Sequence, residues 1–155
     1  MRVLIIAEAA NPEWTSVPLV GWSHAMALAK VTDAHLITQV RNREAMARSG
    51  LAPERYTCID SEAVAGAMWK LGSRLRGGAG KGWTTVMAAA SVGYYYFERL
   101  VWRQFGARIK AREFDIVHRI TPLSPTVPST LAAKCAKAGV PFRVSATAWQ
   151  AAVVI

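Results

Sequence analysis

The fold is decided by residues 114–128, which read Phe-Asp-Ile-Val-His-Arg-Ile-Thr-Pro-Leu-Ser-Pro-Thr-Val-Pro. Ile116 and Val117 are β-branched and apolar, which is typical of a buried strand, and the segment that follows them is polar and rich in proline. His118 and Thr121 fall where this strand passes into its loop. Because open α/β sheets bind ligands beyond the carboxyl ends of their strands, we expect a ligand site here.

Strand and helix patterns alternate along the rest of the chain, which is typical of a mostly parallel sheet with helices on both faces. The sequence therefore predicts an α/β fold, a Rossmann-like parallel sheet of about five strands, in residues 1–146. An uncharged apolar tail follows at 147–155. The predicted strands are Arg2–Ala9, His35–Val40, Arg55–Ile59, Phe114–Arg119 and Phe142–Ser145. The predicted helices are Gly21–Lys30, which follows a loop at Asn11–Val20, and Arg43–Ser49, which Gly50 closes. A third helix is predicted from Asp60 or Ser61 to about Leu75. Trp83–Arg112 is predicted as one helix or two, and Ser129–Ala138 as a last helix that Gly139 ends.

Composition limits the domain count and the class of partner. A chain of 155 residues with 52% hydrophobic residues can bury one core. Its net charge of +9 favours anionic partners such as nucleic acid, acidic lipid or phosphorylated small molecules. Cys58 and Cys135 have no metal-ligand spacing, so we expect a reduced, cytoplasmic chain. The apolar run Val3–Ala7 stops at Glu8, too early for a signal peptide, so we expect no secretion.

Neither of two familiar nucleotide motifs fits. The segment 77–85 reads Gly-Gly-Ala-Gly-Lys-Gly-Trp-Thr-Thr, but a P-loop needs Ser or Thr where Gly82 follows Lys81. A dinucleotide fingerprint needs three glycines after the first strand, where this chain offers only Gly21. We therefore expect no NAD and no other cofactor, although a single phosphate can still bind at the amide-rich start of the Gly21 helix. A small nucleotide-binding protein of another Rossmann-like family remains an alternative.

The region 70–112 contains nine basic residues and one acid, Glu98, interleaved with Trp, Tyr and Phe. Such a composition suits a helix lying in a membrane interface, where cations meet anionic lipid. It suits equally well an amphipathic helix whose aromatic residues pack in the core. The uncharged run 82–97 is shorter than the roughly 20 residues of a membrane span, so we expect none. No recognition-helix pattern indicates nucleic acid. The candidate anion patch comprises Lys70, Arg74, Arg76, Lys81, Arg99 and Arg103.

Four segments, in this order, carry a resemblance. They are Met-Arg-Val-Leu-Ile-Ile at 1–6, Val-Pro-Leu-Val-Gly-Trp-Ser-His-Ala-Met-Ala-Leu-Ala at 17–29, Asp-Ile-Val-His at 115–118 and Thr-Pro-Leu-Ser-Pro-Thr at 121–126. Over about residues 1–145 the chain resembles the N-terminal domain of GT-B glycosyltransferases of family 4, also called group 1. The resemblance implies transfer of a sugar, with retention, from a nucleotide-sugar donor to a glycan or lipid-linked acceptor, without an essential metal. In such enzymes the first domain mainly holds the acceptor and the second the donor.

Site residues follow from the resemblance and from the strand ends. His118 matches the histidine that lines the cleft, and Gly21 matches the loop glycine that approaches the donor phosphate. We expect His118 to orient substrate rather than to transfer a proton, but a lone histidine at a strand end is as often only a hydrogen-bonded structural residue. No G-x-S-x-G elbow surrounds Ser124, which excludes the usual hydrolase nucleophile. The further candidate substrate-binding residues are Glu8, Asn11, His24, Thr121 and Ser124.

The chain also departs from the family pattern. Val20 stands where the family usually has a second glycine, Ile120 where it often has a second histidine, and no histidine follows the fifth strand. The donor-binding C-terminal domain is not in this sequence, and the tail at 147–155 fits a truncated product, so we expect no sugar transfer by the isolated chain. We expect a cytoplasmic protein with peripheral contact to the inner face of the membrane. The alternative is a non-catalytic module that docks on anionic membrane or on a partner through residues 70–112.

Overall fold

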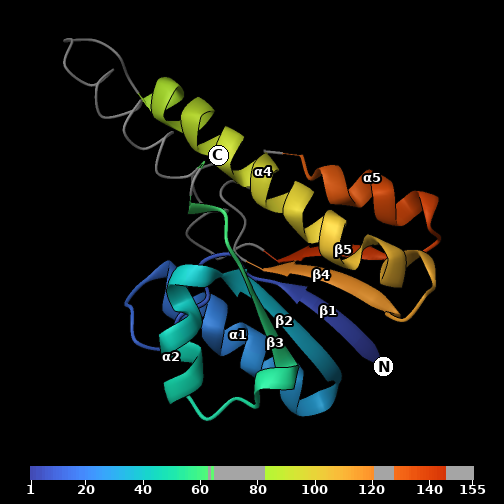
Figure 1. Cartoon of the computed structure of the whole chain (residues 1–155), viewed down its shortest axis with the longest axis horizontal. Coiled ribbons are helices and arrows are strands. Elements are labelled where there is room, and N and C mark those ends of the chain that lie inside the picture. Colours follow the sequence, from blue (N-terminus) through green and yellow to red (C-terminus); the bar gives the residue numbers. More distant parts are fainter. Residues whose placement is uncertain (63, 65–82, 121–127, 146–155) are drawn as a thin grey trace.

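The computed structural model describes residues 1–62, 64, 83–120 and 128–145, with side chains in the long helix from Ser91 onward. Its centre is a five-stranded sheet of order β3-β2-β1-β4-β5 in which every pair is parallel (Figure 1). The predicted Rossmann-like α/β fold is therefore confirmed. The strands are β1 (Arg2–Ile6), β2 (Asp33–Gln39), β3 (Tyr56–Ile59), β4 (Ile116–Ile120) and β5 (Phe142–Ser145).

Helices cover both faces of this sheet, as Figure 1 shows. The short turns η1 (Val40–Asn42) and η2 (Pro53–Arg55) lead into α2 and β3. On one face lie α1 (Val17–Val31) and α2 (Arg43–Arg48), and on the other lie α4 (Trp83–Lys110) and α5 (Thr130–Lys137). No described helix is long and apolar enough to cross a membrane.

Each face of the sheet has its own hydrophobic core. Leu4 and Ile6 of β1 pack in one cluster with residues of α4 and α5 such as Phe97 and Leu131. Val3 and Ile5 pack in the other cluster, on the α1 side. A central strand covered on both faces needs apolar side chains at successive positions, which explains the continuous run at the start of the chain.

The element boundaries differ from prediction at several points. The helix predicted from Gly21 begins four residues earlier, at Val17. Pro18 is compatible with its first turn, because the amide that a proline lacks would have no intrahelical partner at that position. β1 ends at Ile6 rather than at Ala9, and α4 is a single helix. Gly139 ends α5 with φ 69°, as predicted, and a Cβ there would lie 2.6 Å from an Arg112 nitrogen. The helix predicted to run to Leu75 lies almost wholly outside the described residues.

The chain order of the strands defines where a ligand site belongs. From β1 the chain moves outward through β2 to β3 and then crosses back, so β4 pairs with the free side of β1. His118 and Arg119 of β4 lie opposite Ile5 and Ile6 of β1. In open α/β sheets, ligands bind beyond the carboxyl ends of the two strands at such a reversal, here β1 and β4.

Candidate functional site

His118 presents its side chain on the α1 side of β4. Its ring lies 5.8 Å from the ring of His24 in α1, centroid to centroid, at an interplanar angle of 79°. His118 Nε2 is 2.8 Å from Ser145 Oγ, at the end of β5. The imidazole is half-buried, and burial first, then the nearby His24, lowers the pKa of His118 below its usual 6.5. At neutral pH this is a neutral ring that can donate or accept one hydrogen bond with a ligand hydroxyl.

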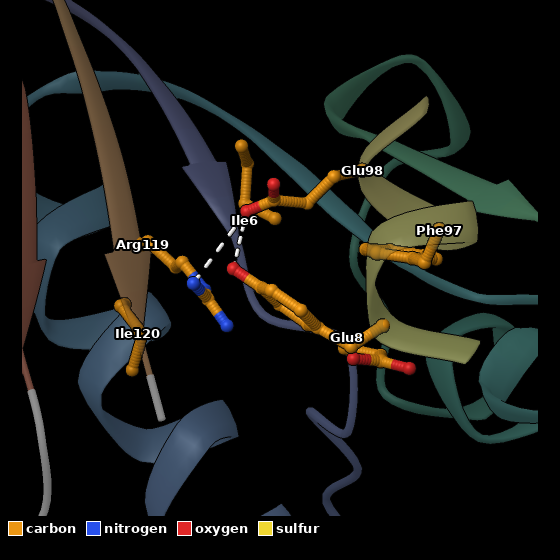
Figure 2. A pocket seen from close by; sticks show the side chains of 7 residues that line it. Ile6, Glu8, Phe97, Glu98, Arg119 and Ile120 are labelled. Atoms are coloured by element: carbon orange, nitrogen blue, oxygen red, sulfur yellow. Dashed lines mark hydrogen bonds and ion pairs between the residues drawn. The ribbon is translucent and has the colours of Figure 1, made fainter. Parts of the chain in front are cut away.

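Arg119, the next residue of β4, points to the opposite face, because successive side chains of a strand alternate. Arg119 is 3% exposed and faces Glu98 of α4, which is 1% exposed (Figure 2). Arg119 Nη1 lies 3.5 Å from Glu98 Oε1, and the guanidinium carbon lies 3.8 Å from the centroid of the Tyr94 ring. Burial lowers the pKa of Arg119 to about 10, with Glu8 opposing the shift, so the side chain is still charged at neutral pH.

Glu98 is the centre of a saturated hydrogen-bond cluster. Its Oε2 accepts from the Thr130 amide at 2.7 Å and from Thr130 Oγ1 at 2.6 Å. Its Oε1 accepts from the Tyr94 and Ser129 hydroxyls. The Ser129 hydroxyl also caps α5 by accepting from the Leu131 amide. Glu98 thus fastens the end of β4 and the start of α5 to α4, and its charge is used within the fold.

Glu8 follows β1 at the same edge of the sheet. Its Oε1 accepts from Gln39 Nε2 at 2.6 Å. Burial is the largest influence on the pKa of Glu8 and raises it, while Arg41 and Arg119 oppose the rise. The pocket that Glu8 shares with Arg119 and Glu98 has about 10 Å³ of space, room for about one water molecule. Burial therefore favours the protonated form of Glu8.

Two other candidate residues take structural positions. Asn11 is 1% exposed, donates to Asn42 Oδ1 at 3.0 Å and accepts from the Glu13 amide at 2.9 Å, so it holds the loop after β1. Gly21 is buried within α1 as its fifth residue, beyond the four amides that a helix start leaves free. The structure thus brings His24 to His118 and Glu8 to Arg119. Thr121 and Ser124 lie outside the described residues.

The candidate anion patch is described only in part. Arg99 and Arg103 are exposed on α4. Lys70, Arg74, Arg76 and Lys81 lie outside the described residues.

Sequence reasoning missed Arg119 and the role of Glu98. A usable signal was present, since Glu98 is the one acid between Lys70 and Arg112 and shares a helical face with the buried Tyr94 and Val101. A lone acid on an apolar helical face needs a buried partner.

Comparison with protein-family models, with curated proteins and with solved structures found no match in any of the three. Within the described part of the chain, no group of three or more His, Cys, Asp or Glu side chains is placed to hold a metal ion.

Proposed function

We propose that this chain is the acceptor-binding half of a retaining, nucleotide-sugar-dependent glycosyltransferase of the GT-B class. The observation that carries the proposal is the His118–His24 pair, which lies on β4 and α1 beside the strand reversal. The sequence resemblance assigns acceptor contacts to this same half of the enzyme. A half-buried, neutral imidazole suits the role of orienting an acceptor hydroxyl without taking its proton.

In this proposal the chain supplies only one wall of the reaction cleft. A second Rossmann-like domain holds the donor and offsets the charge that develops on the leaving diphosphate. The rate then depends on holding the acceptor hydroxyl and the donor sugar together between the two domains. The free cysteines Cys58 and Cys135 suit the cytoplasmic location that we propose for this step.

A binding screen with a matched pair of histidine variants tests the acceptor role. The chain, His118→Ala and His35→Ala would be applied to a panel of immobilised glycans and lipid-linked saccharides. His35 is the control because it too is half-buried on a strand, and its Nε2 lies 2.8 Å from Thr57 Oγ1. We expect His118→Ala alone to lose binding, by roughly tenfold for one lost hydrogen bond of about 1.4 kcal/mol. Equal loss in both variants would remove His118 from the site.

Titration with free nucleotides separates this proposal from the alternative of a small nucleotide-binding protein. The acceptor half is expected to bind UDP, GDP and ADP only weakly. Submicromolar affinity of the chain alone for any of them would contradict the proposal. Product formed by the chain alone from a nucleotide sugar would show instead that both substrates are held within these 155 residues.

A further inference from the structure

A basic groove is lined by side chains of α4 and α5 and by Ala138, which follows α5. Its floor is Trp102, which is half-buried. Lys110 Nζ lies 5.6 Å and Lys134 Nζ 5.3 Å from the centroid of the Trp102 ring. Lys137 and Ala138 complete the lining of a groove of about 250 Å³. Among the described residues the lining contains no acidic side chain, so the ammonium groups of Lys110 and Lys134 beside the indole have no counter-charge in the groove.

The positive charge of this groove continues along α4. Arg99, Arg103 and Lys110 are all exposed, and their spacing of four and seven residues places them on one side of the helix. The only acid of α4 is Glu98, which is buried and points toward Arg119. Together these side chains form a basic surface that we define as Arg99, Arg103, Lys110, Lys134 and Lys137, with Trp102 at its centre.

Several arginines elsewhere in the molecule are paired with acids. Arg48 of α2 forms ion pairs with Glu13 and Glu44, and Arg55 of η2 pairs with Asp33. In the basic surface, by contrast, none of the five cations has an ion pair with an acid among the described residues. Lys30, Arg41 and Arg43 elsewhere in the molecule also have no ion pair among the described residues, but on the α4–α5 side three such cations, Lys110, Lys134 and Lys137, line one groove.

We propose that this basic surface docks the protein on an anionic phospholipid bilayer. Lipid phosphates supply the missing counter-charge, and the linear array on α4 matches a flat, extended surface. The indole of Trp102 lies among the lysines at the depth of the headgroups, where Trp side chains are favoured. The proposal differs from the patch expected from sequence, since it adds residues of α5 and uses only described residues. It rests on the charge of this surface and on the position of Trp102, and it stands whether or not the chain takes part in sugar transfer.

Vesicle co-sedimentation of the full chain tests the proposal. We expect binding to vesicles of phosphatidylcholine with phosphatidylglycerol, no binding to phosphatidylcholine alone, and loss of binding in high salt because exposed charges are screened. Binding to both vesicle types, or to neither, would overturn the proposal.

A pair of charge reversals locates the surface. Lys137→Glu and Lys30→Glu change the net charge equally, and each removes a lysine from the last turn of a helix, but Lys30 lies on α1 across the sheet. We expect Lys137→Glu, a change of two charge units at about 1 kcal/mol each, to weaken binding roughly 30-fold, and Lys30→Glu to change it little. Equal weakening by both variants would show a response to net charge instead, and would overturn the assignment. Arg103→Gln, exposed on α4, gives the same test if Lys137→Glu does not fold.

Discussion

His118 and Arg119 are neighbours in β4 but have opposite surroundings. On the α1 side, His118 is half-buried, with the Ser145 hydroxyl as hydrogen-bond partner and the His24 ring beside it. On the α4 side, Arg119 is buried against Glu98, whose carboxylate already accepts from Tyr94, Ser129 and Thr130. One face of the strand end is therefore used for stability, while the other leaves the His118 imidazole half-buried beside His24.

Glu98→Ala should be the most damaging single change on the stabilising face. It leaves the buried Arg119 without its carboxylate and removes the acceptor for the hydroxyls of Tyr94, Ser129 and Thr130. Breaking a buried charge pair in this way costs about 3–5 kcal/mol, which is a large part of the stability of a domain this size. The free energy of unfolding in urea measures the loss.

Glu44→Ala is the matched control for Glu98→Ala. Glu44 also lies in a helix and pairs with an arginine, but its side chain is 86% exposed and its contact with Arg48 is 3.5 Å. We expect a loss of no more than about 0.5 kcal/mol, as for other exposed helical pairs. Similar losses in the two variants would contradict the role given to Glu98.

Arg119→Met should cost less than Glu98→Ala, about 2 kcal/mol. Glu98 keeps its four hydrogen bonds from Tyr94, Ser129 and Thr130, so removal of the arginine does not leave the buried carboxylate unsatisfied. A methionine can also fill most of the volume beside the Tyr94 ring. A loss equal to or larger than that of Glu98→Ala, in the same urea measurement, would show that the ion pair rather than the hydrogen-bond cluster stabilises this face.

The fold could be predicted because each element carries a local pattern. β-branched runs, polar loops and glycines such as Gly139 indicate strands and helix ends without any tertiary information. The start of α1 could not be read in the same way. The sequence pattern predicts a loop at Pro18, although a proline fits the first turn of a helix as well.

The candidate site could be predicted only where strand ends determine it. His118 is predicted because a polar residue stands out near the end of a buried strand. The pairing of Glu98 with Arg119 joins residues 21 positions apart on different elements, and only the packing of α4 on the sheet brings them together. A local pattern cannot report such a contact, although the isolation of Glu98 among basic residues indicated that it needed a partner.

On the α1 side, His118→Ala should cost little stability, about 1 kcal/mol or less. Among the described residues its side chain makes one hydrogen bond, to Ser145 Oγ at 2.8 Å, and water can replace that bond because the ring is only half-buried. The urea midpoint should therefore move far less than for Arg119→Met. A loss above about 2 kcal/mol would mean that His118 belongs to the framework as Arg119 does, and would remove the contrast between the two faces.

The smallest expected effect is in the pH dependence of stability. Burial lowers the pKa of His118 in the folded chain, whereas in the unfolded chain it is near 6.5. Below about pH 6.5 the unfolded chain then binds more protons at this site than the folded chain, so stability falls as pH decreases through the folded pKa, and above pH 6.5 the site contributes nothing. Burial also lowers the pKa of His35, which acts in the same direction, while the raised pKa of Glu8 acts in the opposite one. His118→Gln should therefore lose less stability than the wild type between pH 7 and pH 5. His35→Gln should also lose less stability than the wild type over this pH range, independently of His118. An unchanged pH profile in His118→Gln would mean that water reaches the imidazole freely, and the α1 side would then lack the half-enclosed polar site proposed for the acceptor.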